Sequence, residues 1–217
     1  MQRVASQKIE YLKLQTVFLT HLHSDHTLDL VTLLQINDST PLIARKTPLN
    51  IYGCEGTGAW FDTLMLAFPG IYPSTYELSI TEFGKSQWNW EGFSISTILT
   101  KHTDNSIAFR FNLADGSFVY TGDATLTEEL IEFCTGVDLL ICECSFPAGW
   151  ETIDHMNSDT LGDLAEGAKP KHLVVTHRYP PAISCDIREE IGRKFKGKIT
   201  LAVDGSKFHL ERTEGLE

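Results

Sequence analysis

Short apolar runs rich in β-branched and aromatic residues recur along the chain, separated by polar and glycine-containing turns. Such runs are typical of strands with at least one buried face. Residues 114–117, Ala-Asp-Gly-Ser, have the composition of a hairpin turn between two of these runs. The pattern predicts strands at residues 17–20, 93–99, 107–113, 118–121, 139–142, 173–176 and 199–203.

Longer segments between the runs carry apolar residues at the spacing of an amphipathic helix. Thr127, Ser158 and Ser184 are predicted N-caps, because their hydroxyls can accept a hydrogen bond from the first helical turn. Gly136 and Gly197 fit helix stops. Strands that alternate with helices indicate an α/β chain. The predicted helices are residues 28–36, 58–68, 127–133, 159–168 and 185–195.

Two aromatic clusters stand out from this pattern. Trp88, Trp90 and Phe93 alternate at strand or turn spacing, which indicates packing within the core or between sheets. Aromatic and aliphatic residues between Trp60 and Phe68 fit one face of a helix. That face is predicted to belong to the core, with a substrate cleft or a dimer contact as the alternatives.

The composition is that of a soluble globular protein. A chain of 217 residues with 42% hydrophobic and 22% charged residues predicts one domain over residues 1–217. No apolar run is long enough to span a membrane, and residues 1–14 are too polar for a signal peptide. Five cysteines, an odd number, favour reduced thiols in the cytoplasm over a disulfide framework. The net charge of −11 favours solubility and gives no sequence-wide signature of nucleic-acid binding.

The segment from Thr20 to His26 is the main candidate for a functional site. Its potential metal ligands are His21, His23, Asp25 and His26, which directly follow an apolar run. If that run is a strand, the first two histidines lie two residues apart and point to the same side. The aspartate and the third histidine come where the chain turns into the next helix, and can therefore face a second position close by. The spacing predicts ligands for two adjacent metal ions, and the alternative is a solvated polar loop.

Further ligand types follow other predicted strands. His102, Asp123 and His177 each stand where an apolar strand meets a loop, and Gly122 would let the backbone approach a metal closely. Each alone is more often structural or exposed, but together with the first cluster they indicate one site. His172 and His209 fall outside this scheme and are interpreted as non-functional.

The order of these motifs resembles the metallo-β-lactamase-fold hydrolases. The motifs are Thr-His-Leu-His-Ser-Asp-His, then His102, then Tyr-Thr-Gly-Asp ending in Asp123, then Glu143-Cys144-Ser145, then His155, then Val-Thr-His ending in His177. The chain looks most like the ribonuclease Z branch of phosphodiesterases, over about residues 17–181. The resemblance implies a four-layer αββα sandwich, a homodimer, and two divalent ions, zinc with manganese or iron as alternatives.

The resemblance also implies a role for each residue. His21, His23 and His102 would bind the first metal, Asp25, His26 and His177 the second, and Asp123 would bridge them. Asp25 would in addition orient a hydroxide and receive a proton. Glu143 would hold His155, which would protonate the departing oxygen. From the sequence alone, a buried salt-bridge carboxylate and an exposed loop histidine remain the alternatives for this pair. No cysteine is placed to bind the second metal, which argues against a β-lactamase.

The chain departs from the family in three places. Only a polar segment precedes the first motif, so the first sheet is expected to lack the usual N-terminal strands. His102 and Asp123 are too close in sequence to hold a tRNA-binding arm, and residues 176–181 match the family only in part. The missing arm, together with the acidic charge, favours hydrolysis of a small or nucleotide-like phosphodiester over tRNA processing. The alternatives are a ribonuclease Z acting on tRNA 3′ ends, a lactonase, thioesterase or sulfatase, and a truncated, inactive metal-binding protein.

Overall fold

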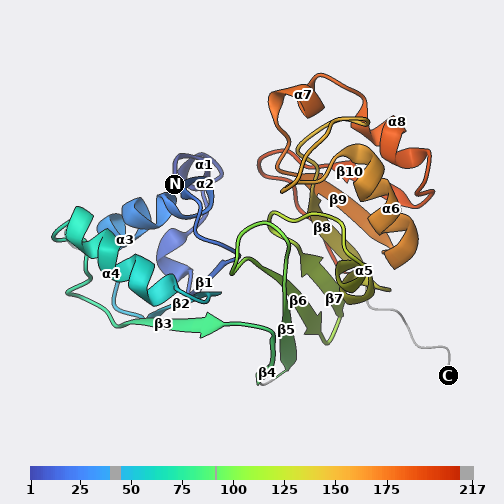
Figure 1. The fold of residues 1–217 in the computed structure, drawn as a ribbon. Coiled ribbons are helices and arrows are strands. Elements are labelled where there is room, and N and C mark those ends of the chain that lie inside the picture. The colour runs from blue at the N-terminus through green and yellow to red at the C-terminus, as the bar shows by residue number, and fades with distance from the viewer. Residues whose placement is uncertain (40–44, 91, 211–217) are drawn as a thin grey trace. The chain divides into compact units, whose positions relative to one another are not determined.

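The computed structural model describes residues 1–39, 45–90 and 92–210. The chain divides into two compact units, residues 1–84 and 85–217, and each is described by itself (Figure 1). Within the described residues, none of the helices has both the length and the apolar character needed to cross a bilayer. The single domain predicted over residues 1–217 stays a prediction.

The first unit is built on a parallel sheet in the order β1-β2-β3, with α3 and α4 over one face (Figure 1). The helix-facing core includes Leu34, Leu49 and Ile51, which are fully buried. On the opposite face Tyr52 stacks on Phe18, with ring centroids 5.3 Å apart. The strands are β1 (Thr16–Leu19), β2 (Leu49–Cys54) and β3 (Leu78–Phe83), and the helices are α3 (Asp29–Ser39) and α4 (Thr57–Ala67).

Short helices precede and follow the first strand. The chain starts with α1 (Gln2–Ser6) and a 3-10 helix, η1 (Tyr11–Lys13), and runs into β1 without an earlier strand in the described residues 1–15. The helix α2 (Ser24–Thr27) follows closely on β1. Residues 20–26, called the histidine segment below, therefore span the turn after β1 and the start of α2, as the pattern predicts.

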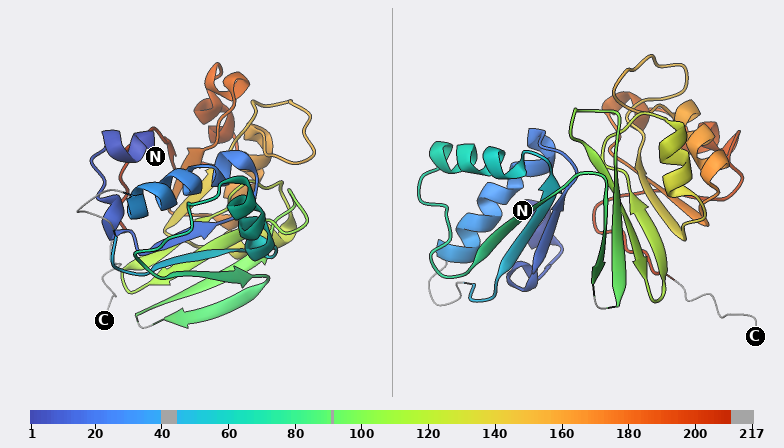
Figure 2. Two further views of the ribbon diagram at one scale, coloured as in Figure 1. Left: turned by 90° about the vertical axis from the view of Figure 1, so that its left-hand side faces the viewer. Right: turned by 60° about the horizontal axis from the view of Figure 1, so that its bottom comes forward.

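The second unit contains a seven-stranded sheet in the order β10-β9-β8-β7-β6-β5-β4. Strands β4 to β7 pair antiparallel and β7 to β10 pair parallel. Helices α5, α6 and α8 cover one face of this sheet (Figure 2). The elements are β4 (Ser86–Trp90), β5 (Phe93–Leu99), β6 (Ile107–Leu113), β7 (Gly116–Tyr120), α5 (Glu128–Cys134), β8 (Leu139–Glu143), α6 (Ser158–Ala168), β9 (His172–Thr176), α7 (Pro180–Ile183), α8 (Ile187–Gly192) and β10 (Lys198–Leu201).

The side chains of β8 and of the residue that follows it alternate between the buried core and the face of the sheet that carries Glu143. Leu140, Cys142 and Cys144 are fully buried in the core beneath the helices. Because side chains alternate along a strand, Glu143 lies on the opposite face. Burial raises the pKa of the Cys142 thiol well above its usual value. Cys142 and Cys144 therefore serve as small buried hydrophobic side chains, on the opposite face of the sheet from Glu143.

The predicted elements agree best in the antiparallel part of the second sheet. Strands 93–99 and 107–113 are confirmed to the residue, whereas β2, β3 and β4 were not predicted. Thr127 is confirmed as an N-cap, accepting from the Leu130 amide. Asn157, and not Ser158, caps α6, because its amide forms a capping box with Thr160. The last helix is capped by Asp186 in place of Ser184, and it ends at Gly192, well before Gly197.

Candidate metal centre

In the first unit, the imidazole rings of the histidine segment lie close to one another. His21 is fully buried, and its ring lies 4.8 Å from that of His23 and 4.1 Å from that of His26, centroid to centroid. The His26 Nε2 lies 3.3 Å from the Asp25 Oδ2. The Thr27 hydroxyl donates to the His23 carbonyl at 2.8 Å, which fixes the start of α2. All four predicted ligands of this unit therefore cluster at the end of β1.

The second unit brings its three predicted ligands together. Strands β5, β7 and β9 run in the same direction, so His102, Asp123 and His177, which follow them, emerge at one edge of the sheet. The Asp123 Oδ2 lies 3.6 Å from the His102 Nε2 and 3.4 Å from the His177 Nε2. Asp123 is 3% exposed, so the carboxylate sits between two imidazoles out of bulk solvent.

Hydrogen bonds fix which nitrogen of each ring can bind a metal. The His102 Nδ1 lies 2.7 Å from the Asp154 carbonyl oxygen, which can only accept, so Nδ1–H donates and Nε2 carries the lone pair. The Ser145 hydroxyl donates to the Glu143 Oε2 at 2.6 Å, so its oxygen accepts from the His177 Nδ1 at 3.1 Å. In both rings the lone pair is then on the nitrogen closest to Asp123. Such outer hydrogen bonds orient the histidine ligands of metal sites.

A second acid–base pair lies beside these ligands. Glu143 is 1% exposed, and His155 Nδ1 donates to its carboxylate with distances of 3.0 and 3.2 Å to the two oxygens. The same Nδ1 lies 4.0 Å from the Asp123 Oδ2. Burial tends to lower the pKa of His155, but the hydrogen bond and charge of Glu143, together with Asp123 and Asp154, raise it above its ordinary value. The contact predicted between Glu143 and His155 is therefore present, and their catalytic roles stay predictions.

Ser145 is a site residue that the sequence analysis names within a motif but to which it gives no role. It is fully buried and joins the Glu143 carboxylate to the His177 ring through one hydroxyl. The available signal was the two-residue spacing from Glu143, which places Ser145 on the same face where β8 ends. Asp154 was missed, because it acts through its backbone carbonyl. Its contact with His102 joins residues that are 52 positions apart, and no local sequence pattern indicates it.

The donor atoms fit divalent metal ions. Imidazole nitrogens and carboxylate oxygens, without sulfur, are ligands that zinc, manganese and iron accept in proteins. Within the second unit, His102, Asp123 and His155 form one group that could hold an ion, and Glu143, His155 and His177 form another. By contrast, the His172 Nε2 lies 2.8 Å from the Thr200 hydroxyl, a contact between β9 and β10 away from this edge.

Comparison with known proteins gives the family. A family model described as the beta-lactamase superfamily domain matches residues 1–178. A probable metallo-hydrolase of Bacillus subtilis, YhfI, is 28% identical over 89% of this chain and 78% of its own length. The crystal structure of that protein, described as a metallo-β-lactamase fold protein, has a TM-score of 0.77 at 26% identity and covers 93% of this chain and 80% of that one.

Two further similarities point in the same direction. A ribonuclease Z of Halalkalibacterium halodurans is 27% identical over 94% of this chain and 82% of its own length. A diphosphatase of the PhnP family has a TM-score of 0.73 at 21% identity, covering 97% of this chain and 77% of that one, which shows a shared fold. The predicted class, α/β with the αββα sandwich of the metallo-β-lactamase fold, is thereby confirmed. The chain belongs to the beta-lactamase superfamily, as a metallo-β-lactamase-fold hydrolase related to ribonuclease Z.

Proposed function

We propose that this protein is a dinuclear-metal phosphodiesterase acting on a small or nucleotide-like phosphodiester. The observation that supports this reaction best is the Glu143–His155 pair close to Asp123. A phosphodiester with a poor leaving group needs a proton donor beside its departing oxygen, and His155 could serve as that donor. In the proposal, zinc is the first choice of metal, with manganese or iron as alternatives. The proposed ligands are His21, His23, Asp25, His26, His102, Asp123 and His177.

The metals, when bound, would supply a nucleophilic hydroxide at neutral pH and neutralise charge on the phosphoryl oxygens. The residues of the chain do the rest. Asp25 orients the attacking water and takes its proton. His155 passes a proton from Nε2 to the departing oxygen; because its Nδ1–H is donated to Glu143, this requires the doubly protonated ring, which the negative charge of Glu143 favours. Against the opposing effect of burial, the hydrogen bond and charge of Glu143 raise the pKa of His155, in the direction that a proton donor needs.

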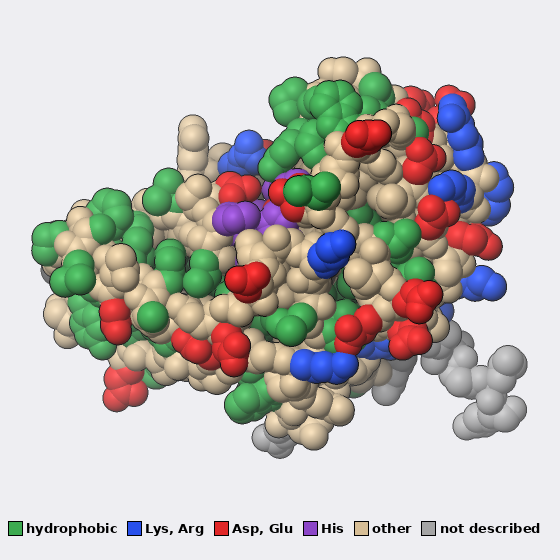
Figure 3. Space-filling model, viewed as in Figure 1, with side chains coloured by type: hydrophobic (Ala, Val, Ile, Leu, Met, Phe, Trp, Pro, Cys, Tyr) green, Lys and Arg blue, Asp and Glu red, His purple; other side chains and the backbone are tan. Residues whose placement is uncertain are grey.

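The charge of the chain favours a small substrate over folded RNA. The net charge is −11, and over the helices of the second unit Lys and Arg side chains are interspersed with Asp and Glu on the face seen in Figure 3. Several of these cations are paired, including Lys194 with Asp163 at 2.9 Å and Lys85 with Glu129 at 2.5 Å. Polynucleotide binding draws on unpaired basic side chains, since affinity comes from phosphate contacts.

A ribonuclease Z activity on tRNA 3′ ends is the second candidate, favoured by the similarity to proteins of that name. It would use the same Glu143–His155 pair, so the two candidates differ in substrate and not in chemistry. Cleavage of a tRNA precursor with a steep salt dependence of binding would select it. The homodimer and the cytoplasmic location stay predictions.

The experiment is hydrolysis of bis(p-nitrophenyl) phosphate by metal-stripped protein reconstituted with zinc or manganese. Turnover should require metal, be lost in Asp25→Ala, and fall in His155→Ala. His172→Ala is the matched control, because that ring contacts the Thr200 hydroxyl and the Phe208 ring, away from the candidate metal ligands. A dinucleotide has a more basic leaving oxygen than nitrophenol, so His155→Ala should lose more on it, about 100-fold. No turnover with metal demonstrably bound would refute the phosphodiesterase.

A further inference from the structure

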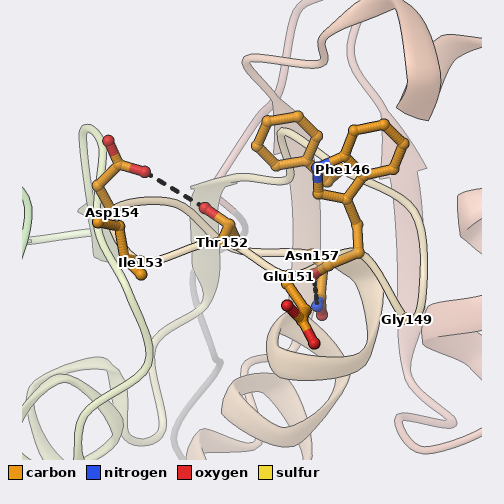
Figure 4. Close-up of a pocket in the computed structure, with 8 residues that line it drawn as sticks. Phe146, Gly149, Glu151, Thr152, Ile153, Asp154 and Asn157 are labelled. Atoms are coloured by element: carbon orange, nitrogen blue, oxygen red, sulfur yellow. Dashed lines mark hydrogen bonds between the residues drawn. The ribbon is translucent and has the colours of Figure 1, made fainter.

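The loop between β8 and α6, residues 146–157, encloses an open hollow of about 790 Å³ on the second unit. Its aromatic part is made by Phe146 and Trp150, whose rings stack in parallel at 5.2 Å with 4° between their planes. Figure 4 shows Phe146 at one side of the hollow, with Ile153 and Asp154 at the other. Ile153 is 86% exposed and Trp150 46%, so two large apolar side chains face solvent in one short loop.

Exposed apolar side chains that lie together around a hollow are a feature of ligand-binding surfaces, and hydrogen bonds hold the backbone of this loop. The Asn157 side-chain amide donates to the Trp150 carbonyl at 2.9 Å, and the Ala148 backbone amide donates to the Glu190 carboxylate at 2.9 Å. Trp150 is therefore presented on a fixed backbone. With one ring face on Phe146 and nearly half its surface in solvent, it can stack on a second planar group.

The charges around the hollow restrict what that group can be. The ionisable residues that line it are Glu151 and Asp154, and no Lys or Arg is among the lining residues. Two carboxylates repel a phosphate, so a nucleic-acid strand running through the hollow is disfavoured. They tolerate an uncharged ring and can accept hydrogen bonds from an amino group on it. A single nucleobase meets both conditions.

The hollow adjoins the proposed proton donor. Phe146 packs edge-on against Tyr179 at 5.4 Å, and Tyr179 in turn packs against His155 at 5.5 Å. A smaller hollow of about 300 Å³ shares Thr152 and Ile153 with the larger one and is lined by His155 itself. Lys101 lines the smaller hollow and no carboxylate does, so charge changes sign from one side of the loop to the other. A phosphoryl group suits the side with His155, and a neutral ring suits the other.

We infer that the hollow formed by Phe146, Trp150 and Ile153 binds the base of a nucleoside leaving group by stacking on Trp150. That the nucleoside is the leaving group rests on the proposed phosphodiesterase activity, whereas the binding of a base is independent of catalysis. It narrows the substrate class to diesters that carry a single nucleoside on the departing oxygen. The chain is thereby assigned a preference for short nucleotide esters over long RNA.

The test is adenosine binding to metal-stripped protein, which separates this inference from catalysis. The chain has four tryptophans, so 5-fluorotryptophan labelling gives few ¹⁹F signals, and Trp150→Phe identifies that of Trp150 by its loss. Adenosine should shift the Trp150 signal saturably. By calorimetry, Trp150→Ala should bind adenosine at least about tenfold more weakly, and Trp150→Phe, which keeps a ring, about as well as wild type.

Trp88 gives the matched control, because it is an indole of similar exposure, 40%, on β4. Trp88→Ala should leave adenosine binding unchanged. Equal losses in both alanine variants, or no shift of the Trp150 signal, would overturn the base site while leaving metal-dependent turnover untouched. Binding at Trp150 by a protein that hydrolyses no phosphodiester would instead refute the proposed function and keep the site.

Discussion

Replacing Glu143 by glutamine should destabilise the second unit, because this carboxylate organises the segments around it. Its Oε1 accepts from the Ala124 amide at 2.7 Å and from the His155 Nδ1 at 3.0 Å. Its Oε2 accepts from the Ser145 hydroxyl at 2.6 Å and from the Met156 amide at 3.3 Å. One buried anion therefore ties the loop after β7, the end of β8 and the start of α6 to one another.

Glutamine keeps the shape of the side chain but replaces one acceptor oxygen by an NH₂ group. At the Oε2 position the Ser145 hydroxyl can rotate to accept, whereas the Met156 amide is left facing a donor. One to two hydrogen bonds to a charged acceptor are lost, each worth about 1.5–3 kcal/mol. We expect a loss of about 3 kcal/mol in the free energy of unfolding. For a chain of this size that corresponds to a fall in Tm of roughly 10 °C.

The assay is thermal unfolding by calorimetry, with urea unfolding as the second measurement, both on metal-stripped protein. The control is Glu132→Gln, the same chemical change on an exposed residue of α5, which should leave Tm within about 1 °C. If Glu143 served chemistry alone, its replacement would be neutral or stabilising, as is common for strained active-site groups. An unchanged or higher Tm for Glu143→Gln would therefore refute the structural role argued here.

Three other changes test the packing and the electrostatics of the second unit. Burial raises the pKa of Asp138, but hydrogen bonds from Lys171 at 2.6 Å and from the Ser117 amide at 2.7 Å outweigh it and lower that pKa. Asp138→Asn should therefore cost about 1 kcal/mol at pH 7, and urea titrations should show the difference vanishing as pH falls through the folded-state pKa, below about 3.9. Ser145→Ala should weaken zinc binding by about 10- to 100-fold in a chelator competition, with little change in KM. Leu161→Ala, at a fully buried position of α6, should lower the free energy of unfolding by about 3 kcal/mol in urea.

The elements that the sequence predicts best are those whose pairing is local. Strands β5 and β6 are consecutive in the chain and pair antiparallel, so the local sequence pattern contains almost all the information. Strands β2 and β3 pair in parallel across a helix, and β2 includes Asn50 and Gly53, which break the apolar run. Their strand character comes from partners far away in sequence. A local pattern does not contain that information.

Helix ends were missed for a related reason. Asn157 and Ser158 are both good capping residues, and the choice between them depends on whether Thr160 can return a hydrogen bond. At the last helix, Asp186 competes with Ser184, and the carboxylate accepts from the Glu189 amide. Sequence alone ranks such neighbours as equals, whereas the fold selects the one whose backbone lies outside the helical region at that point.

For the site, residue types were predictable and their supporting contacts were not. His102, Asp123 and His177 were found because each ends an apolar strand, and they converge because those strands run in the same direction. Ser145 and Asp154 were not, because a serine hydroxyl and a backbone carbonyl are common everywhere. What makes them specific is a partner 32 or 52 positions away.

The acceptor at each Nδ1 separates the histidines of the second unit into two kinds. His102 donates to a carbonyl and the His177 ring to a hydroxyl, both neutral, which fixes the tautomer and leaves a lone pair on Nε2. His155 donates to the Glu143 carboxylate, an anion that stabilises the doubly protonated ring and raises its pKa. A fixed Nε2 lone pair suits a metal ligand, and a ring whose protonated form is stabilised suits a proton donor. The Ser145 hydroxyl connects the Glu143 carboxylate to the His177 ring, so both kinds of histidine belong to one hydrogen-bonded chain. A substitution at either end of that chain should therefore alter the hydrogen bonds at the other end.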